Sequence, residues 1–444
     1  MDFTIHTLGP CTVPSPMLEK YSVMDTSFIG DDVKIIHDPV VREDSPSAID
    51  PSQCFEKAGP REKVFFNPRE VRAAIVTCGG LCPGINNVIR SIVMESYHRY
   101  RVRSIIGIRY GYRGLDPKNG HSPVELNPGT VDDIHLLGGT ILGSSRGGTE
   151  DMEVLVETLA RLKVNILYTI GGDGTLKGAH AIDETARRKG LRLAVVGVPK
   201  TIDNDISFIE RSFGFETAFS KAVDSIYAAH VESKGAPNGI GLVKLMGRHS
   251  GFIAAHACLA MSDVNYVLLP EVPFDLRGEN GLLPHLKERM LNRNHAVICV
   301  AEGAGQDLLE EDAASRKKDA SGNVALGDIG TFLKEQIESY FSEAGIEINL
   351  KYIDPSYIIR SAPAVPNDSI FCAQLGQNAV HAAMAGKTDM VIGHWNGAYT
   401  HVPIELAVSK RKVMDPKSRF WHTVTGATGQ PVSMRNPAHQ ERER

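Results

Sequence analysis

Short apolar runs alternate with amphipathic segments through most of the chain after residue 70. The run at 164–170 has the length and Val/Ile content of a buried parallel strand, and apolar residues follow it at helical spacing. The same alternation predicts strands at 73–77, 104–108, 192–198, 240–245, 264–269 and 295–301, and helices at 151–162, 177–189, 216–232, 250–261 and 280–293. We therefore expect an α/β protein with two doubly wound, Rossmann-like domains, each with a parallel sheet, and an N-terminal extension.

The pattern divides the chain into five segments. An arm at 1–70 precedes a first α/β domain at 71–215, to which residues 367–425 return, a second α/β domain spans 216–366, and a polar tail spans 426–444. The arm has no sustained period, but it carries too many apolar residues for plain disorder, among them Met17, Leu18, Tyr21 and Phe28. We expect it to lie on the body of the protein or on a neighbouring subunit.

Two further segments are expected at the surface. Residues 304–327 are charged and small, which predicts an insertion, and the last twenty residues are polar, which predicts a frayed end.

Composition narrows the classes of function. The chain has 444 residues, of which 42% are apolar and 23% charged, and a formal net charge of −5. Because no Lys/Arg block is interleaved with aromatic residues, we expect no nucleic-acid surface. The N-terminus lacks the basic start of a signal peptide, no apolar segment is long enough to span a membrane, and the seven cysteines are scattered. These features predict a cytoplasmic protein with reduced thiols.

The strand at 164–170 runs into the sequence GGDGT, which ends at Thr175. Glycines at a strand-to-helix turn let the backbone approach a polyphosphate, and the following helix offers unpaired N–H groups to the anion. Asp173 is then placed to bind Mg²⁺. A bare glycine turn is more often structural, but an aspartate flanked by glycines, with a threonine behind it, favours a nucleotide or phosphate site.

A second loop, PKTIDND, follows the strand at 192–198 and holds two carboxylates and an amide within four residues. Asn and Asp are common in turns. Beside a nucleotide loop, however, Asp203 can accept the proton of a substrate hydroxyl while Lys200 offsets charge on the phosphoryl oxygens. Phosphoryl transfer requires little more than aligned reactants, cations and a base.

Three later segments carry groups that suit phosphates and sugars. Arg248 lies in MGRHSG, Glu302 ends a strand in AEG, and Tyr357 and Arg360 lie in YIIR. Taken alone, a strand-end arginine or glutamate is about as often a solvated surface charge. The sequence AGKT at 385–388 ends like a Walker A loop, but it follows a helical stretch rather than a strand, so we interpret it as a chance match.

In this order, GGDGT, PKTIDND, MGRHSG, AEG and YIIR resemble the motifs of the 6-phosphofructokinases, from about residue 73 to about residue 396. The resemblance implies transfer of a phosphoryl group from ATP, with Mg²⁺, to the 1-hydroxyl of fructose 6-phosphate, in a cleft between a nucleotide-binding first domain and a sugar-phosphate-binding second domain. It also implies a homodimer or homotetramer.

The resemblance assigns roles residue by residue. The nucleotide would be held by Gly80, Tyr112, Arg146, Gly147, Gly172, Asp173, Gly174 and Thr175, with Asp173 on the metal. Catalysis would rest on Asp203 as the base, with Lys200, Thr201 and Arg248. The sugar phosphate would be held by Thr201, Ile202, Asp203, Met246, Gly247, Arg248, Glu302, Tyr357 and Arg360.

The chain departs from the bacterial pattern of this family at three places. It has Lys200 where the bacterial enzymes have glycine, Gly239 where they have an arginine that reaches a neighbouring subunit's substrate, and YIIRSAP in place of QRGG. Together with the long arm, these features are similar to the plant and trypanosomatid ATP-using branch. They put the bacterial style of effector regulation in doubt and leave open which effector, if any, controls the enzyme.

Gly174 and Lys200 point to different phosphoryl donors. The resemblance implies that pyrophosphate users carry aspartate and lysine at these positions, whereas bacterial ATP users carry glycine at both. A side chain at 174 would project where the α-phosphate of ATP must pass, so Gly174 favours ATP. A pyrophosphate-dependent enzyme and a non-catalytic sugar-phosphate sensor are the alternatives. A NAD or lipid kinase would account for GGDGT but not for MGRHSG and YIIR.

Overall fold

The computed structural model describes residues 1–18, 28–40, 49–148, 151–309 and 325–440. Tyr21 and most of the predicted insertion at 304–327 lie outside the described residues. The chain forms two compact units: unit 1 comprises Met1–Thr201, Ile206–Gly214 and Ser361–Arg411, and unit 2 comprises Ile202–Asp205, Phe215–Arg360 and Lys412–Arg444. None of the described helices is both long enough and apolar enough to cross a membrane.

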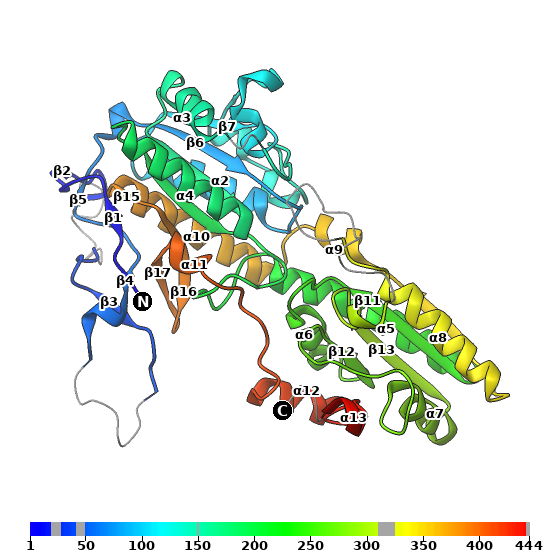
Figure 1. The fold of residues 1–444 in the computed structure, drawn as a ribbon. Coiled ribbons are helices and arrows are strands. Elements are labelled where there is room, and N and C mark those ends of the chain that lie inside the picture. The colour runs from blue at the N-terminus through cyan, green and yellow to red at the C-terminus, as the bar shows by residue number, and fades with distance from the viewer. Residues whose placement is uncertain (19–27, 41–48, 149–150, 310–324, 441–444) are drawn as a thin grey trace. The chain divides into compact units, whose positions relative to one another are not determined.

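Unit 1 is built on a nine-stranded sheet with the order β3-β4-β17-β16-β10-β9-β6-β7-β8 (Figure 1). Its centre is parallel, as predicted, and consists of β6 (Arg72–Thr77), β7 (Ser104–Ile108), β9 (Ile166–Gly171), β10 (Ala194–Pro199) and β16 (Met390–Trp395). The edges are antiparallel and consist of β8 (Val124–Glu125) on one side and β17 (Ala398–Pro403), β4 (Cys54–Lys57) and β3 (Lys34–Ile36) on the other. The central strands are almost wholly apolar because both of their faces are buried.

The helices of unit 1 are α2 (Ile85–His98), α3 (Met152–Arg161), α4 (Asp173–Arg188), α10 (Pro366–Met384) and α11 (Ile404–Ala407). Apolar residues of α3 and α4 share one core with alternate residues of β6 and β9, including Leu155, Ala179, Val76 and Leu167. Helix α2 packs against α10. The connection from β9 to β10 runs through α4, as predicted, but α4 begins at Asp173 rather than at residue 177.

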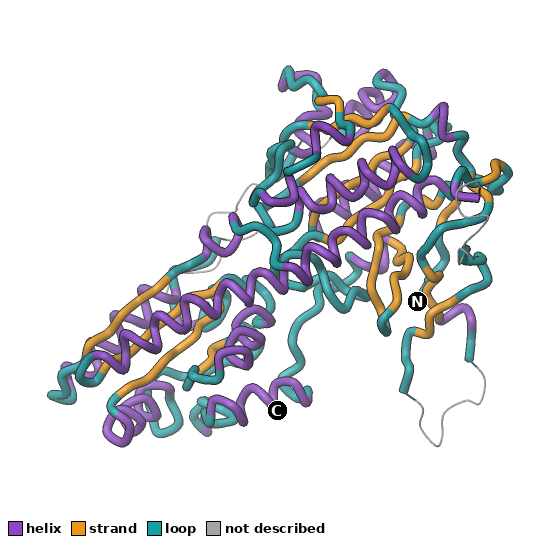
Figure 2. The backbone as a smooth tube through the Cα atoms, turned by 180° about the vertical axis from the view of Figure 1, so that it is seen from behind, coloured by secondary structure: helices purple, strands orange, loops and turns teal. Residues whose placement is uncertain are grey.

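Unit 2 contains a four-stranded parallel sheet with the order β12-β13-β11-β14. The strands are β12 (Tyr266–Leu268), β13 (His295–Ala301), β11 (Gly239–Leu245) and β14 (Asn349–Ile353). The helices are α5 (Phe215–Gly235), α6 (Phe252–Met261), α7 (Leu282–Arg293), α8 (Ile329–Glu343), α9 (Ser356–Ser361), α12 (Arg419–Thr428) and α13 (Pro437–Gln440). In both views the long helix α5 runs beside β11 (Figures 1 and 2).

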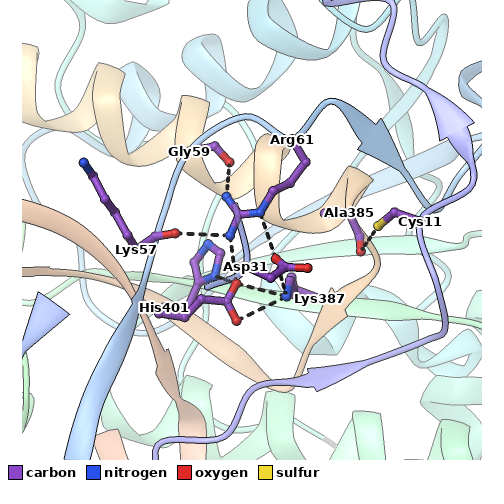
Figure 3. A network of polar contacts seen from close by, with 9 residues as sticks. Cys11, Asp31, Lys57, Gly59, Arg61, Ala385, Lys387 and His401 are labelled. Atoms are coloured by element: carbon purple, nitrogen blue, oxygen red, sulfur yellow. Dashed lines mark hydrogen bonds and ion pairs between the residues drawn. The ribbon is translucent and has the colours of Figure 1, made fainter. Parts of the chain in front are cut away.

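The N-terminal arm lies on unit 1, which agrees with the expectation that it packs on the body. Strand β1 (His6–Thr7) pairs with β15 (Lys387–Thr388), and β4 joins the main sheet through β17; within the arm, β2 (Val13–Pro14) pairs with β5 (Lys63–Val64). Side chains of these segments converge on the buried carboxylate of Glu56 in β4, which contacts Arg61, Lys387 of β15 and His401 of β17. Figure 3 shows these three basic residues close together. Because Lys387 is held by Glu56 at 3.0 Å, AGKT does not present its lysine to a phosphate.

The C-terminal part differs from the prediction in two respects. Residues 412–425 belong to unit 2, where Glu271 accepts a hydrogen bond from the backbone N–H of Met414 at 2.9 Å. The tail is not frayed over its described residues, because Met434 is buried and Asp275 accepts a hydrogen bond from the backbone N–H of Asn436 at 2.6 Å. Its polar composition was misleading because these groups bind a carboxylate of the body rather than water.

Candidate active site

The glycine turn after β9 forms the N-terminal end of α4. Gly172 precedes the helix, Asp173 is its first residue, and the backbone N–H of Thr175 donates to the carbonyl of Gly172 at 2.9 Å. The first N–H groups of a helix have no partner within it and attract anions. A Cβ added at Gly174 would meet nothing within 4 Å, so the space beside this turn is open.

Tyr112 contacts this turn from the protein interior. It lies in a short 3₁₀ helix (Gly111–Leu115), is buried, and donates its hydroxyl to the carbonyl of Thr175 at 2.7 Å. Burial raises the pKa of its phenol well above the usual value. Tyr112 therefore fixes the first turn of α4 from the protein interior, and its predicted contact with the nucleotide stays a prediction.

Lys200 and a second glycine turn, which follows β6 and contains Gly79 and Gly80, lie together at the carboxyl end of the unit 1 sheet. Lys200 follows β10, is buried, and donates from Nζ to the carbonyl of Gly80 at 2.8 Å. Gly79 in turn donates its N–H to the carbonyl of Ser145 at 2.9 Å, which brings the loop that carries Arg146 and Gly147 to the same edge. Arg146 is exposed there. The predicted nucleotide residues of unit 1 thus gather around the ends of β6, β9 and β10.

Asp203 belongs to unit 2 and sits among charged groups. The hydroxyl of Ser250 donates to the backbone carbonyl of Asp203 at 2.8 Å and so joins PKTIDND to the MGRHSG segment. Burial, reinforced by the carboxylates of Asp205 and Glu302, raises the pKa of Asp203 to about 8, while Arg248 opposes this rise. A carboxylate with a raised pKa near a cation is a candidate general base.

The ends of β11 and β13 are tied together beside Arg248. The N–H of Glu302 donates to the carbonyl of Leu245 at 2.8 Å, and the N–H of Gly303 donates to the carbonyl of Gly247 at 3.1 Å. Gly247 has φ +129°, a backbone conformation that favours glycine. Met246, which precedes it, is half-buried. The sequence MGR is therefore held against the end of β13, where Glu302 directly follows the strand.

Helix α9 carries the YIIR residues. Tyr357 is 79% exposed, and the Arg360 guanidinium carbon lies 5.2 Å from the centroid of the Tyr357 ring. Burial raises the pKa of Glu302, whereas Arg248, Lys244 and Arg360 lower it, so these cations lie close enough to act on one carboxylate. Unit 2 thus brings together Asp203, Arg248, Glu302 and Arg360. Thr201 and Ile202 lead into this group, and Thr201 accepts a hydrogen bond at its carbonyl from Ser212 at 2.6 Å.

The residues present fit a Mg²⁺ site completed by substrate. Among the described residues, no group of three or more His, Cys, Asp or Glu side chains is arranged to hold a metal. Mg²⁺ usually keeps several waters and binds one or two carboxylates together with substrate phosphates. Asp173, at the open end of the glycine turn and 2.9 Å from the ammonium of Lys177, provides one such carboxylate.

Sequence reasoning missed three supporting residues. Ser250 stands within the quoted motif MGRHSG but was assigned no role, and its hydrogen bond to Asp203 is visible only in the structure. Glu271 accepts hydrogen bonds from the N–H of Gly251 at 3.0 Å and gave no local signal. Lys244 reads as an ordinary strand residue.

A glycine turn with open space beside it and a buried carboxylate among cations are each features that suit phosphoryl transfer. A family model described as phosphofructokinase matches residues 72–383. The chain belongs to the phosphofructokinase family, which confirms the resemblance noted from its motifs.

The relatives extend over nearly the whole chain. An ATP-dependent 6-phosphofructokinase of Borreliella burgdorferi is 50% identical over 98% of both chains. The ATP-dependent 6-phosphofructokinase of Trypanosoma brucei brucei is 44% identical over 96% of this chain and 87% of that protein. Among solved structures, a pyrophosphate-dependent phosphofructokinase from Marinobacter aquaeolei has a TM-score of 0.66 at 19% identity and covers 82% of this chain and 92% of that chain, which supports the fold alone.

Proposed function

We propose that the chain is an ATP-dependent 6-phosphofructokinase of glycolysis. It transfers the γ-phosphoryl group of ATP to the 1-hydroxyl of fructose 6-phosphate and yields fructose 1,6-bisphosphate and ADP. The observation that carries this proposal is the similarity to relatives named ATP-dependent 6-phosphofructokinase, 50% identical over 442 residues in the first case.

Asp203 takes the proton of the 1-hydroxyl as its oxygen forms the new bond to phosphorus. Its pKa of about 8 places it near working pH, where a base combines adequate basicity with a sufficient fraction of the charged form. Arg248 and Lys200 stabilise negative charge on the transferred oxygens. Mg²⁺ held at Asp173 would neutralise charge on the phosphates of ATP.

The sugar phosphate is held by groups of unit 2. Arg360, a planar cation on α9, suits the 6-phosphate, and Glu302 accepts hydrogen bonds from sugar hydroxyls. Met246, Gly247, Thr201, Ile202 and Tyr357 complete the set that the family motifs assign to this substrate. Nucleotide binding rests on the glycine turns and on the loop of Arg146 and Gly147.

Gly174 supports ATP as the donor. It lies in the first turn of α4 with open space where a side chain would project. Lys200 assists transfer from either donor and excludes neither. The pyrophosphate-dependent reaction is therefore the second candidate.

A coupled assay with purified full-length protein, fructose 6-phosphate and Mg²⁺ tests the proposal. ATP should support rapid formation of fructose 1,6-bisphosphate, pyrophosphate should be a poor donor, and excess EDTA should abolish turnover. Efficient turnover with pyrophosphate but not with ATP would show that pyrophosphate is the donor. Binding of fructose 6-phosphate without turnover from any donor would favour the sensor. We also propose a cytoplasmic homo-oligomer, which light scattering on the same preparation tests for dimer or tetramer.

A further inference from the structure

Lys244 lies on β11, two residues before Met246, and binds two carboxylates from distant parts of unit 2. Its Nζ lies 3.0 Å from Asp328 and 3.0 Å from Asp354, and only 15% of its side chain is exposed. Asp328 precedes α8 and accepts a hydrogen bond from the hydroxyl of Thr331 at 2.7 Å. Asp354 precedes α9. One cation therefore joins three segments of the chain.

Asp354 connects this cation to the start of the arginine-bearing helix. Its Oδ1 accepts hydrogen bonds from the N–H of Ser356 at 3.1 Å and from the hydroxyl of Ser356 at 2.5 Å, whereas its Oδ2 contacts Lys244. Helix α9 has six residues, too few to be stable without outside contacts. Ile359 buries one side of this helix, and the contacts of Asp354 fix its start. The placement of Arg360 on α9 therefore depends in part on what fixes Asp354.

The charges at this point also affect the substrate site. The cations Lys244, Arg248 and Arg360 all lower the pKa of Glu302, while Asp354 raises it. Without Lys244, Asp354 would become an uncompensated negative charge close to the groups that would receive a phosphate. Loss of the lysine would thus loosen α9 and add repulsion toward an anion.

We propose that Lys244 is a positioning residue for fructose 6-phosphate: by binding Asp354 it fixes α9, and with it Arg360, in the orientation that receives the 6-phosphate. Lys244 acts through these residues and has no contact of its own with the reacting atoms. The proposal rests on the proposed function.

The test replaces Lys244 with methionine, which keeps the apolar stem and removes the charge. In the full-length enzyme, Lys244→Met should raise the KM for fructose 6-phosphate about tenfold or more, equivalent to about 1.4 kcal/mol, with the KM for ATP changed less than about twofold. Lys244→Arg should recover most of the loss, because guanidinium also pairs with carboxylates. A general loss of structure would lower activity toward both substrates together.

Matched variants of the two partners separate the route through α9 from other effects. Asp354→Asn keeps an oxygen for Ser356 but loses the ion pair, so it should raise the same KM. In the Lys244→Met background it should cause no further rise, because it also removes the uncompensated charge of Asp354. Asp328→Asn removes the pair on the α8 side and should leave that KM nearly unchanged, as should Lys351→Met on the exposed side of β14.

Several outcomes would overturn the proposal. The proposed route through α9 would be wrong if Lys244→Met left the KM for fructose 6-phosphate unchanged. It would also be wrong if Asp328→Asn raised this KM as much as Lys244→Met does. If Lys244→Met does not fold, Asp354→Asn decides alone through the same comparison of the two KM values. Failure of the wild-type protein to use fructose 6-phosphate would instead refute the proposed function.

Discussion

At the scale of single residues, the charge of Asp203 is the most informative feature. Burial and two neighbouring carboxylates raise its pKa to about 8, far above the usual aspartate value of about 3.9. In the folded state this carboxyl therefore resists ionisation. The protonated carboxyl contributes fully to the free energy of unfolding below about pH 4, and this contribution is lost as the pH rises through the folded-state pKa. At the pH where Asp203 acts as a base, we therefore expect it to lower the stability of the folded protein.

Asp203→Asn should accordingly separate activity from stability. We expect kcat to fall about 10²- to 10⁴-fold, the usual worth of a general base, while the melting temperature at pH 8 rises relative to wild type and the difference shrinks toward pH 4. Steady-state assays and thermal unfolding at both pH values measure this. Near wild-type turnover of the variant at neutral pH would remove Asp203 from the role.

A matched variant tests the cause of the raised pKa. Asp205→Asn removes the neighbouring carboxylate that acts most strongly on Asp203 after burial. The pKa of Asp203 should fall, so the acid limb of the kcat/KM profile should move to lower pH. A shift to higher pH would contradict this electrostatic account.

Gly174→Asp tests the donor. Because a Cβ at 174 meets no atom of the protein within 4 Å, the fold should accept the side chain, and any loss should arise at the bound nucleotide. We expect kcat/KM for ATP to fall at least about a hundredfold, about 2.7 kcal/mol, and pyrophosphate activity to emerge. Thermal unfolding is the control for folding. A variant that still uses ATP well would refute the steric argument.

Arg360→Ala tests the assignment of the two substrates. A charge-assisted contact to a phosphomonoester is lost while the glycine turns of unit 1 are unchanged, so the KM for fructose 6-phosphate should rise far more than that for ATP. Initial rates with each substrate varied in turn provide the measurement. A rise in the KM for ATP alone would mean that the substrates are exchanged.

At the scale of elements, the sequence predicts those helices, strands and turns that local residue patterns determine. The central strands and the GGDGT turn follow from apolar runs and from glycine positions, and they are present. The helix after GGDGT begins four residues earlier than predicted because Asp173 and Gly174, poor residues inside a helix, are acceptable in its first turn, where a carboxylate is favourable. The arm strands are short, two to four residues, and two of them, β1 and β4, pair with strands hundreds of residues away.

Long-range charge pairs are equally hidden from sequence patterns. Lys244 reads as a strand residue because Asp328 lies 84 residues further along the chain. Glu56 and Lys387 are separated by 331 residues, and the AGKT sequence around Lys387 pointed to a phosphate rather than to Glu56. Such pairs form only after the sheet has brought their elements together, so no local periodicity reports them.

Lys387→Met tests the charge network that joins the arm to β15. The side chains of Lys387 and Glu56 are only 6% and 7% exposed, so removing the cation leaves a buried carboxylate with one partner fewer. We expect a loss of about 3–5 kcal/mol in the free energy of unfolding, with kcat/KM of the folded enzyme unchanged. Chemical denaturation measures the loss. Lys189→Met, at a surface ion pair, is the control and should change little.

At the scale of the whole molecule, the family model for phosphofructokinase covers less of the chain than the two folded units do. The match spans residues 72–383, whereas the arm contributes β3 and β4 to the main sheet and the last described residues pack on Asp275 in unit 2. The segments outside the match are thus parts of the two units. For the C-terminal tail, polar composition suggested a frayed end because it does not reveal that these polar groups pair with the body.

We therefore expect that a chain lacking residues 1–57 does not fold stably and is not a shorter active enzyme. The deletion uncovers the edge of β17, which then presents unpaired backbone groups to other chains. It also removes Glu56, which leaves the buried cations Lys387 and Arg61 without this carboxylate. We expect a lower yield of soluble protein and a lower melting temperature than for the full chain. Glu56→Gln in the full-length chain retains the strand and removes only the charge, so it separates the two causes: it should lower the melting temperature without promoting aggregation. A truncated chain with wild-type solubility, melting temperature and activity would show that the arm is an appendage of unit 1 and not part of its fold.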